Sequence, residues 1–357
     1  MSAPAAVLRV GPPAPTPVGT IALVAAVSVG VLCPRGPLAD LLVAFVTALP
    51  AVAYVLCWRV ELRKLEVRRR LPSTATKGEA LSITHEVRHP GRRLIRDLVL
   101  TEDHPGGGGS SATFFAALLP GARGEARARM FAAQRGHLPL ERLRAVAGDP
   151  FGLFVRVAHL RLATEVLVHP KPARSAAALA LGLARRQGAV GSPETEWVGV
   201  REGRTGDPLR LVHWPLSARR GAPVVRVAAR TRPMLGHVVL DRRPPVGAGR
   251  GSQAFEKAVS LAAGVVLELL ARGIEVDLRI PGAPGEDDLV VEGLRGREGG
   301  GQALDVLALV TPSAADGPPP RAPAGALVVT AREELRLPRA VVLSADAARR
   351  QRVGAAA

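Results

Sequence analysis

Aromatic residues and cysteine are scarce in this chain of 357 residues. It holds seven phenylalanines, three tryptophans and a single tyrosine, Tyr54, and both of its cysteines, Cys33 and Cys57, lie in apolar runs. Two such isolated cysteines exclude a disulfide framework and a zinc-finger spacing in the soluble part, as is typical of a reducing compartment. No thiol outside the apolar runs can serve as a nucleophile, and no Gly-x-Ser-x-Gly elbow of a serine hydrolase occurs.

Acidic residues are also few relative to basic ones. The chain has 48 Lys and Arg against 31 Asp and Glu, a formal net charge of +17. A basic balance is typical of proteins that bind nucleic acid or anionic lipid. The arginines are spread along the chain rather than gathered in one stripe, which favours a compositional origin and makes nucleic acid an unlikely partner.

Two uncharged runs near the N-terminus, Val18–Cys33 and Leu41–Trp58, stand apart from the rest of the chain. A helix that spans a hydrocarbon core of about 30 Å needs about 20 apolar residues, and the second run approaches that length. The pair predicts a transmembrane helical hairpin within residues 1–60, with helices at 18–33 and 41–58. A signal peptide is disfavoured because only Arg9 precedes the first run, and a lipoprotein signal because Leu32 stands where a small residue is needed.

The residues that end and follow the second run set its orientation. Tyr54 and Trp58 lie at its end, where aromatic rings favour the headgroup layer. A basic cluster comes next, and we expect its members to contact anionic lipid: Arg63, Lys64, Arg68, Arg69 and Arg70. The positive-inside rule then places both termini and the soluble domains on the cytoplasmic side of the inner membrane.

Residues 61–164 consist of short, partly alternating runs separated by turn residues such as Pro90-Gly91 and Pro120-Gly121. This pattern predicts an antiparallel β-sandwich-like domain. The domain contains His85-Glu86-Val87-Arg88-His89, which would be a zinc-protease signature on a helix. On a strand, two residues four apart lie about 13 Å from each other, so the two histidines cannot bind one ion together.

Residues 165–357 alternate between expected strands and helices, which indicates a doubly wound α/β domain with a mostly parallel sheet. The clearest strand is His237–Asp241, and the clearest helix runs from Ser252 to about Arg272, with Gly273 as its terminator. The glycine-rich stretch Gly293–Gly301 lacks the lysine and the acidic partner of a phosphate loop. The predicted fold class is therefore α+β multidomain.

Two motifs carry a resemblance to a known family. The first is Asp149-Pro150-Phe151-Gly152-Leu153-Phe154, and the second comprises, in order, Arg201, Gly206, Asp207, Arg210, Trp214, Ser217 and Arg219. With these motifs and its N-terminal membrane hairpin, nearly the whole chain resembles the bacterial family catalogued as domain of unknown function 58. It departs from the family pattern at Gly203, where a tyrosine is usual, and at Pro215, where a basic residue is common.

The resemblance implies that the α/β domain is similar to a von Willebrand factor A domain. Such domains often hold Mg²⁺ through Asp-x-Ser-x-Ser after the first strand. Here Asp241 is followed by Arg242, Arg243, Pro244 and Pro245, so it lacks the hydroxyl partners. We therefore expect no metal and no cofactor, and an ion pair between Asp241 and Arg242 or Arg243. The resemblance also implies a setting beside MoxR-type AAA+ ATPases and other von Willebrand factor A proteins.

The second motif has two compatible interpretations. Gly206 and Asp207 suit a tight turn, in which Asp207 can pair with Arg210 or Arg219 and a buried Trp214 ring staples the loop. Alternatively, Arg210, Trp214 and Arg219 form a docking surface for a partner, because tryptophan and arginine dominate binding hot spots.

Three functional hypotheses follow. The first is a membrane-anchored, cytoplasm-facing scaffold or adaptor that acts with a MoxR-type ATPase in the assembly or maturation of envelope or other protein complexes. The second is an uncharacterised hydrolase that uses Asp207 or Asp241, although no catalytic constellation is recognisable. The third is a protein that binds anionic lipid or nucleic acid through its excess arginine.

Overall fold

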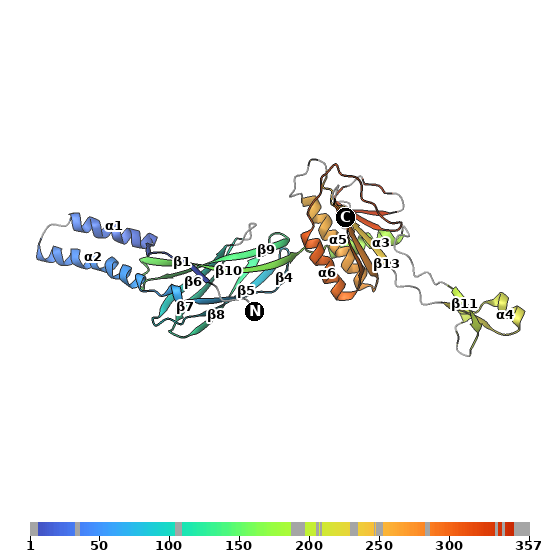
Figure 1. Ribbon diagram of the computed structural model, residues 1–357, viewed down its shortest axis with the longest axis horizontal. Coiled ribbons are helices and arrows are strands. Elements are labelled where there is room, and N and C mark those ends of the chain that lie inside the picture. Colours follow the sequence, from blue (N-terminus) through green and yellow to red (C-terminus); the bar gives the residue numbers. More distant parts are fainter. Residues whose placement is uncertain are drawn as a thin grey trace, which may run out of the picture. The chain divides into compact units, whose positions relative to one another are not determined.

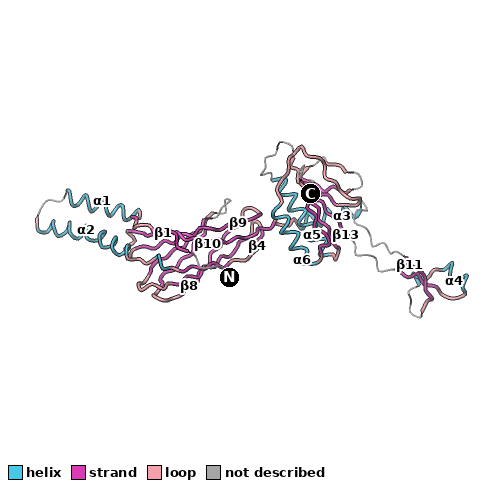
Figure 2. The backbone as a smooth tube through the Cα atoms, viewed as in Figure 1, coloured by secondary structure: helices cyan, strands magenta, loops and turns pink. Residues whose placement is uncertain are grey.

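The chain folds into two units, Met1–His169 and Pro170–Ala357, each with its own hydrophobic core (Figure 1). Both contain helices and strands, and the described residues form four separate sheets, so the protein is of mixed α/β class (Figure 2). The computed structural model describes residues 6–32, 36–103, 109–186, 197–204, 207, 209–228, 235–245, 247, 253–282, 286–332, 335–337 and 340–345.

The first unit is built on two sheets. The larger has the order β1-β10-β9-β6-β7, with β2 and β4 also paired to β10, and the smaller has the order β3-β5-β8. All of these pairs are antiparallel except the one between β4 and β10. The strands of the larger sheet are β1 (Ala6–Val10), β2 (Ala14–Pro15), β4 (Thr74–Thr76), β6 (Ile95–Asp103), β7 (Ser110–Leu118), β9 (Gly136–Gly148) and β10 (Phe154–His169). Those of the smaller sheet are β3 (Glu66–Arg70), β5 (Ala80–Arg88) and β8 (Arg123–Phe131).

Alternation of buried and exposed residues explains how the two sheets face each other. Successive strand residues point to opposite faces, and on β5 the residues Leu81, Ile83 and Val87 are all buried. Leu81 and Ile83 pack in one cluster with Leu140 and Val166 of the larger sheet. The two sheets therefore enclose a common core, as expected for a sandwich-like domain.

His85 occupies the buried position between Ile83 and Val87 on β5, and His89 is the residue directly after this strand. His89 is also buried, and its Nε2 lies 2.6 Å from the carbonyl oxygen of Arg93. The expectation of a strand here is confirmed, and each histidine has its own separate partners.

An ion pair joins the two sheets inside this core. Arg69 on β3 pairs with Glu102 on β6, and neither side chain is exposed. Arg69 also donates a 3.0 Å hydrogen bond to the carbonyl of Leu140, and His85 Nε2 lies 3.6 Å from the Glu102 carboxylate. Burial lowers the pKa of the Arg69 guanidinium, and the charge of Glu102 acts in the opposite direction.

This position of Arg69 corrects the expected lipid-contacting cluster. On β3 the residues Val67 and Arg69 are buried, whereas Arg68 and Arg70 are exposed on the opposite face. Arg63 and Lys64, in the 3-10 turn η1 (Leu62–Lys64), are exposed as well. Four of the five basic residues therefore remain accessible to an anionic surface, and Arg69 does not.

Two apolar helices, α1 (Pro17–Leu32) and α2 (Pro37–Trp58), lie side by side between β2 and β3 of the chain (Figure 1, blue). The helical segment Pro37–Lys64 is long and apolar enough to cross a membrane, whereas α1 is shorter than such a span. The residues before α1 pair with β10 through β1 and β2. The helices are thus inserted into the β-domain, and the expected division at residue 60 cuts through it.

The second unit contains a five-stranded sheet of order β15-β14-β13-β16-β17. The pairs β14–β13, β13–β16 and β16–β17 are parallel, and the edge strand β15 is antiparallel to β14. The elements are β13 (Leu235–Leu240), β14 (Glu275–Ile280), β15 (Leu289–Leu294), β16 (Leu327–Thr330), β17 (Val341–Ser344), α3 (Arg174–Arg186), α5 (Gln253–Ala271) and α6 (Gly296–Leu309).

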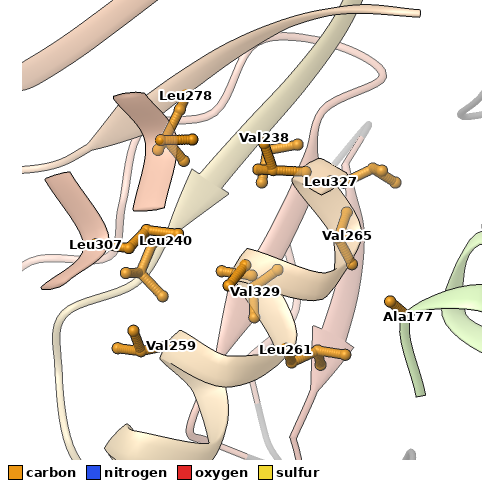
Figure 3. Close-up of a cluster of buried hydrophobic side chains, with 14 of the residues drawn as sticks. Ala177, Val238, Leu240, Val259, Leu261, Val265, Leu278, Leu307, Leu327 and Val329 are labelled. Atoms are coloured by element: carbon orange, nitrogen blue, oxygen red, sulfur yellow. The ribbon is translucent and has the colours of Figure 1, made fainter. Parts of the chain in front are cut away.

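The three helices cover the same face of this sheet (Figure 3). Val238 and Leu240 of β13 point into the cluster that contains Val259 of α5, Leu307 of α6 and Ala177 of α3. On the other face, a second cluster joins Val239, Val328 and Val342 to apolar side chains of the segment 322–340. In the part of the chain that the structure describes, helices therefore lie on one face only, and the expected doubly wound arrangement is not seen.

The glycine-rich stretch Gly293–Gly301 is helical from Gly296 onward. Gly299 and Gly300 are buried, and a Cβ on either would lie 2.9 Å from an atom of Leu294 or Leu267 respectively. Glycine is needed here because α6 approaches β15 and α5 closely.

The remaining described elements of the second unit form a small two-stranded antiparallel sheet. It consists of β11 (Trp197–Glu202) and β12 (Val224–Ala228), which flank the 3-10 turn η2 (Leu209–Leu211) and the helix α4 (Trp214–Arg220). The second sequence motif lies entirely within this segment.

The buried pair between the sheets leads to the first prediction. Replacing Glu102→Gln leaves the Arg69 charge buried without its carboxylate, and we expect a loss of about 3 kcal/mol in the free energy of unfolding. The control Glu86→Gln breaks the exposed pair with Arg70 and should cost less than about 1 kcal/mol. Denaturant unfolding of the full chain, with hydrogen exchange measured in β3 and β6, provides the comparison. Equal effects of the two variants would contradict the assignment.

Candidate functional site

The first motif, Asp149–Phe154, forms the turn between β9 and β10. The buried carboxylate of Asp149 accepts hydrogen bonds from the backbone N–H of Phe151 at 2.8 Å and of Phe154 at 2.6 Å. Gly152 has a φ of 71°, a left-handed conformation that glycine adopts without steric cost. The motif is therefore a turn held by one of its own side chains.

This turn contacts the ends of both apolar helices. Leu153 and Phe154 pack in a buried cluster with Ala53 and Cys57 of α2. Thr16, the residue before α1, donates its hydroxyl to the carbonyl of Gly152 at 2.7 Å. Its backbone N–H donates to the carbonyl of Leu153 at 2.8 Å. The motif therefore connects the helices to the β-domain.

Two further contacts strengthen the same junction. The ring of Tyr54 meets Phe154 edge-to-face at a centroid distance of 5.5 Å. The guanidinium of Arg156 lies 5.3 Å from the centroid of Trp58 and donates to the carbonyls of Trp58 at 2.7 Å and of Val60 at 3.0 Å. The aromatic residues that the sequence places at the end of the second run thus bind the β-domain through part of their surface.

The second motif is held together by an ion pair that the sequence analysis did not select. Asp207 forms a two-pronged pair with Arg201, at 2.7 and 2.8 Å, and accepts the backbone N–H of Arg204 at 2.7 Å. The expected partners were Arg210 or Arg219; the pair observed is with Arg201, and the Arg210 alternative stays untested. The hydrogen bonds that Arg201 donates to Asp207 hold the pKa of Asp207 below its usual range and raise the pKa of Arg201.

Ser217 makes the second connection within this motif. Its Oγ accepts the backbone N–H of Val224 at 2.9 Å and donates to the carbonyl of His213 at 3.0 Å, which joins α4 to β12. Gly221, with a φ of 66°, ends α4 in a left-handed conformation. Gly206 and the side chain of Arg210 lie outside the described residues.

Trp214 does not bury its ring as the stapled-loop interpretation expected. Its exposed fraction is 63%, and that of Leu209 nearby in the sequence is 73%. Arg219 and Arg220 in the last turn of α4 are exposed as well. We call the exposed set of Leu209, Trp214, Arg219 and Arg220 the tryptophan face. The loop is stabilised by polar contacts, which leaves these side chains accessible.

The third candidate site lies at the end of β13. Oδ1 of Asp241 accepts the Nε of Arg243 at 2.9 Å, and Oδ2 accepts its Nη2 at 3.1 Å and the hydroxyl of Thr330 at 2.9 Å. The expected ion pair is confirmed for Arg243, whereas Arg242 donates to Glu286 at 3.1 Å and to the carbonyl of Thr311 at 2.8 Å.

Arginine side chains occupy the carboxyl edge of the parallel strands, where open α/β sheets usually bind ligands. Arg243 also donates to the carbonyl of Gly317 at 3.2 Å, and Arg332 donates to the carbonyls of Pro244 and Ala315. Thr330 and Arg332 were not predicted from the sequence as members of this site. Thr330 could have been found from its position in the sequence, because it ends β16, the parallel strand that pairs with β13.

The helix junction predicts a strong size limit at Gly19 in α1. A Cβ at this position would overlap the carbonyl of Leu153, so Gly19→Ala should cost about 1–3 kcal/mol or displace α1 from the turn. Gly30→Ala is the matched control, since the nearest atom would be Val43 Cγ1 at 3.9 Å. Thermal unfolding of the detergent-purified protein measures both, in the background Trp197→Phe/Trp214→Phe, in which the tryptophan emission comes from Trp58 alone. Similar stability of the two variants would show that α1 does not dock on this turn.

The Asp241 site predicts strong coupling between two residues. Arg243→Met leaves the Asp241 carboxylate buried without its counter-charge and should cost about 3 kcal/mol. In the double variant Asp241→Asn with Arg243→Met, both charges are gone, and the cost should be smaller than the sum of the single effects. Denaturant unfolding with hydrogen exchange in β13 and β16 gives the three values. Additive single effects would contradict the pairing.

No protein-family model matches the chain, and no curated protein matches it. Among solved structures, 29% of the chain is similar to 16% of the β-glucosidase from Listeria innocua, at 13% identity and a TM-score of 0.19. A second match covers 29% of the chain and 93% of a conjugative transposon lipoprotein from Bacteroides eggerthii, at 19% sequence identity and a TM-score of 0.18. A third match covers 40% of the chain and 58% of the sporulation control protein Spo0M from Bacillus subtilis, at 12% sequence identity and a TM-score of 0.20. The chain thus spans less than a fifth of the β-glucosidase, and similarities this low assign neither family nor function.

Proposed function

We propose that this protein is a membrane-anchored adaptor that faces the cytoplasm and docks a partner protein through the tryptophan face. The observation that carries the proposal is the exposure of Trp214, 63%, in a loop that Arg201, Asp207 and Ser217 already hold in shape. A large exposed aromatic ring on a segment that also exposes arginine side chains has the composition of a binding hot spot. The hot spot is presented on a preformed loop, which reduces the ordering cost of binding.

The anchor in this proposal is a transmembrane hairpin made of α1 and α2 in the inner membrane. Its support is the length and apolar composition of the segment Pro37–Lys64, with α1 alongside it. The exposed residues Arg63, Lys64, Arg68 and Arg70 supply positive charge directly after the hairpin, on the side that the positive-inside rule assigns to the cytoplasm.

The partner in this proposal is a MoxR-type AAA+ ATPase, and the process is the assembly or maturation of envelope or other protein complexes. The support is the resemblance to the domain of unknown function 58 family, together with the basic tryptophan face, which suits an acidic partner surface. The strand order β15-β14-β13-β16-β17, with one antiparallel edge strand, is compatible with a domain similar to von Willebrand factor A.

The alternative of a hydrolase is less well supported. Its two candidate carboxylates, Asp207 and Asp241, each form a two-pronged pair with an arginine. The oxygens of a carboxylate in such a pair already accept hydrogen bonds from arginine, so they are not free to exchange a proton with a substrate.

The test compares pull-downs of the tagged full-length protein, solubilised in detergent, with those of the variant Trp214→Ala/Arg219→Ala. We expect an AAA+ ATPase to be recovered with the parent protein and lost with the variant, because the ring and the charge form the contact. Leu289→Ala is the matched control, since it removes an apolar side chain on β15 that is 49% exposed. Circular dichroism must show that the variant is folded. Recovery of the same partners with the folded variant would exclude the tryptophan face as the docking site.

A further inference from the structure

Phe151 is the member of the first motif whose ring points outward. Its exposed fraction is 52%, whereas Leu153 and Phe154 in the same turn are buried. The hydrogen bonds from the backbone of Phe151 and Phe154 to Asp149 fix the turn, so the ring is displayed on a rigid support. An exposed phenylalanine on a self-stabilised turn has no role in the core of the β-domain.

The depth of Phe151 relative to the helices follows from the contacts of its neighbours. Gly152 and Leu153, the next two residues, accept hydrogen bonds from Thr16 immediately before α1. Leu153 and Phe154 pack on Ala53 and Cys57 in the last two turns of α2. The Phe151 ring therefore lies at the level where α1 begins and α2 ends.

The exposed side chains at this level are those of a membrane interface. Val18 and Ile21 in the first turns of α1 are 62% and 69% exposed, and Tyr54 and Trp58 of α2 are partly exposed as well. Basic residues follow directly, with Arg63 and Lys64 both exposed. Apolar, aromatic and basic side chains in this order match the acyl boundary, the headgroup layer and the anionic surface of a bilayer.

We propose that the β9–β10 turn is a further membrane contact, in which the Phe151 ring inserts into the boundary between headgroups and acyl chains. The inference rests on the proposed membrane anchor and adds a contact from the β-domain to it. With α1, α2 and the turn all in contact with lipid, the β-domain itself touches the bilayer surface in addition to its two connections to the helices. The proposed occupant is lipid, because exposed apolar side chains of α1, Val18 and Ile21, lie close in sequence to Thr16, which bonds the same turn.

The test places a single tryptophan at selected sites of the full chain reconstituted in vesicles. In the background Trp197→Phe/Trp214→Phe, Trp58 reports whether α2 enters the bilayer. Adding Trp58→Phe and Phe151→Trp moves the probe to the turn. The matched control adds Trp58→Phe and Phe131→Trp instead, because Phe131 is 59% exposed and ends β8. The strand register places Phe131 opposite Ala80, at the end of the sandwich away from Glu66 and the helices.

Lipids brominated in the upper acyl chain quench nearby tryptophan emission. We expect strong loss of emission for Trp58 and for the Phe151→Trp probe, and no loss for the Phe131→Trp probe. Quenching of Trp58 without quenching of the Phe151→Trp probe would overturn this contact and leave the anchor intact. Absence of quenching at all three sites would overturn the anchor and this contact with it. Equal quenching of the Phe131→Trp and Phe151→Trp probes would overturn the specific role of the turn.

Discussion

The carboxylate of Asp149 carries the constraint on which the first unit depends. Its two backbone hydrogen bonds fix the β9–β10 turn, and that turn supplies the carbonyls and apolar side chains on which both helices dock. Without this anchor, α1 would lose the Thr16 contacts, and α2 would lose the buried surface around Ala53 and Cys57. The capped turn and the Arg156 contacts beside it therefore hold both apolar helices on the β-domain.

Arginine serves a second purpose beyond positive charge in this chain. Arg69 and Arg243 each pair with a carboxylate inside a core or a buried edge, and Arg156 joins three carbonyls of the helix junction. The planar guanidinium can donate several hydrogen bonds at once, which suits it to such positions. Part of the arginine content is therefore structural, and abundant arginine alone does not indicate a polyanion partner.

The apolar periodicity of the sequence predicted the helices and strands whose formation depends on residues close to one another in the chain. The α5 helix, its terminator Gly273 and the strand ending at Asp241 were all expected, because each has a repeating apolar pattern with a clear end signal. The same alternation on β3 already placed Arg69 on the side of Val67, but its charge suggested the surface. The pairing of β1 with β10 was not predictable, since it joins residues about 150 positions apart through a short strand with no strong local signal. Several arginines lie close to Asp207 in the sequence, and the sequence does not show which of them pairs with it. The partner is Arg201 because of the path that the loop takes.

The exposure of Trp214 becomes meaningful only because the loop does not need its ring. A tryptophan ring that stays exposed does not contribute the stabilisation that burial of its large apolar surface would give to the fold of the loop. Here Asp207 holds the loop through hydrogen bonds from Arg201 and Arg204, which also lower its pKa. Ser217 fixes α4 to β12, so the backbone under Trp214 is set before any partner arrives. In the proposed function, the Trp214 ring would be buried on binding the partner rather than on folding.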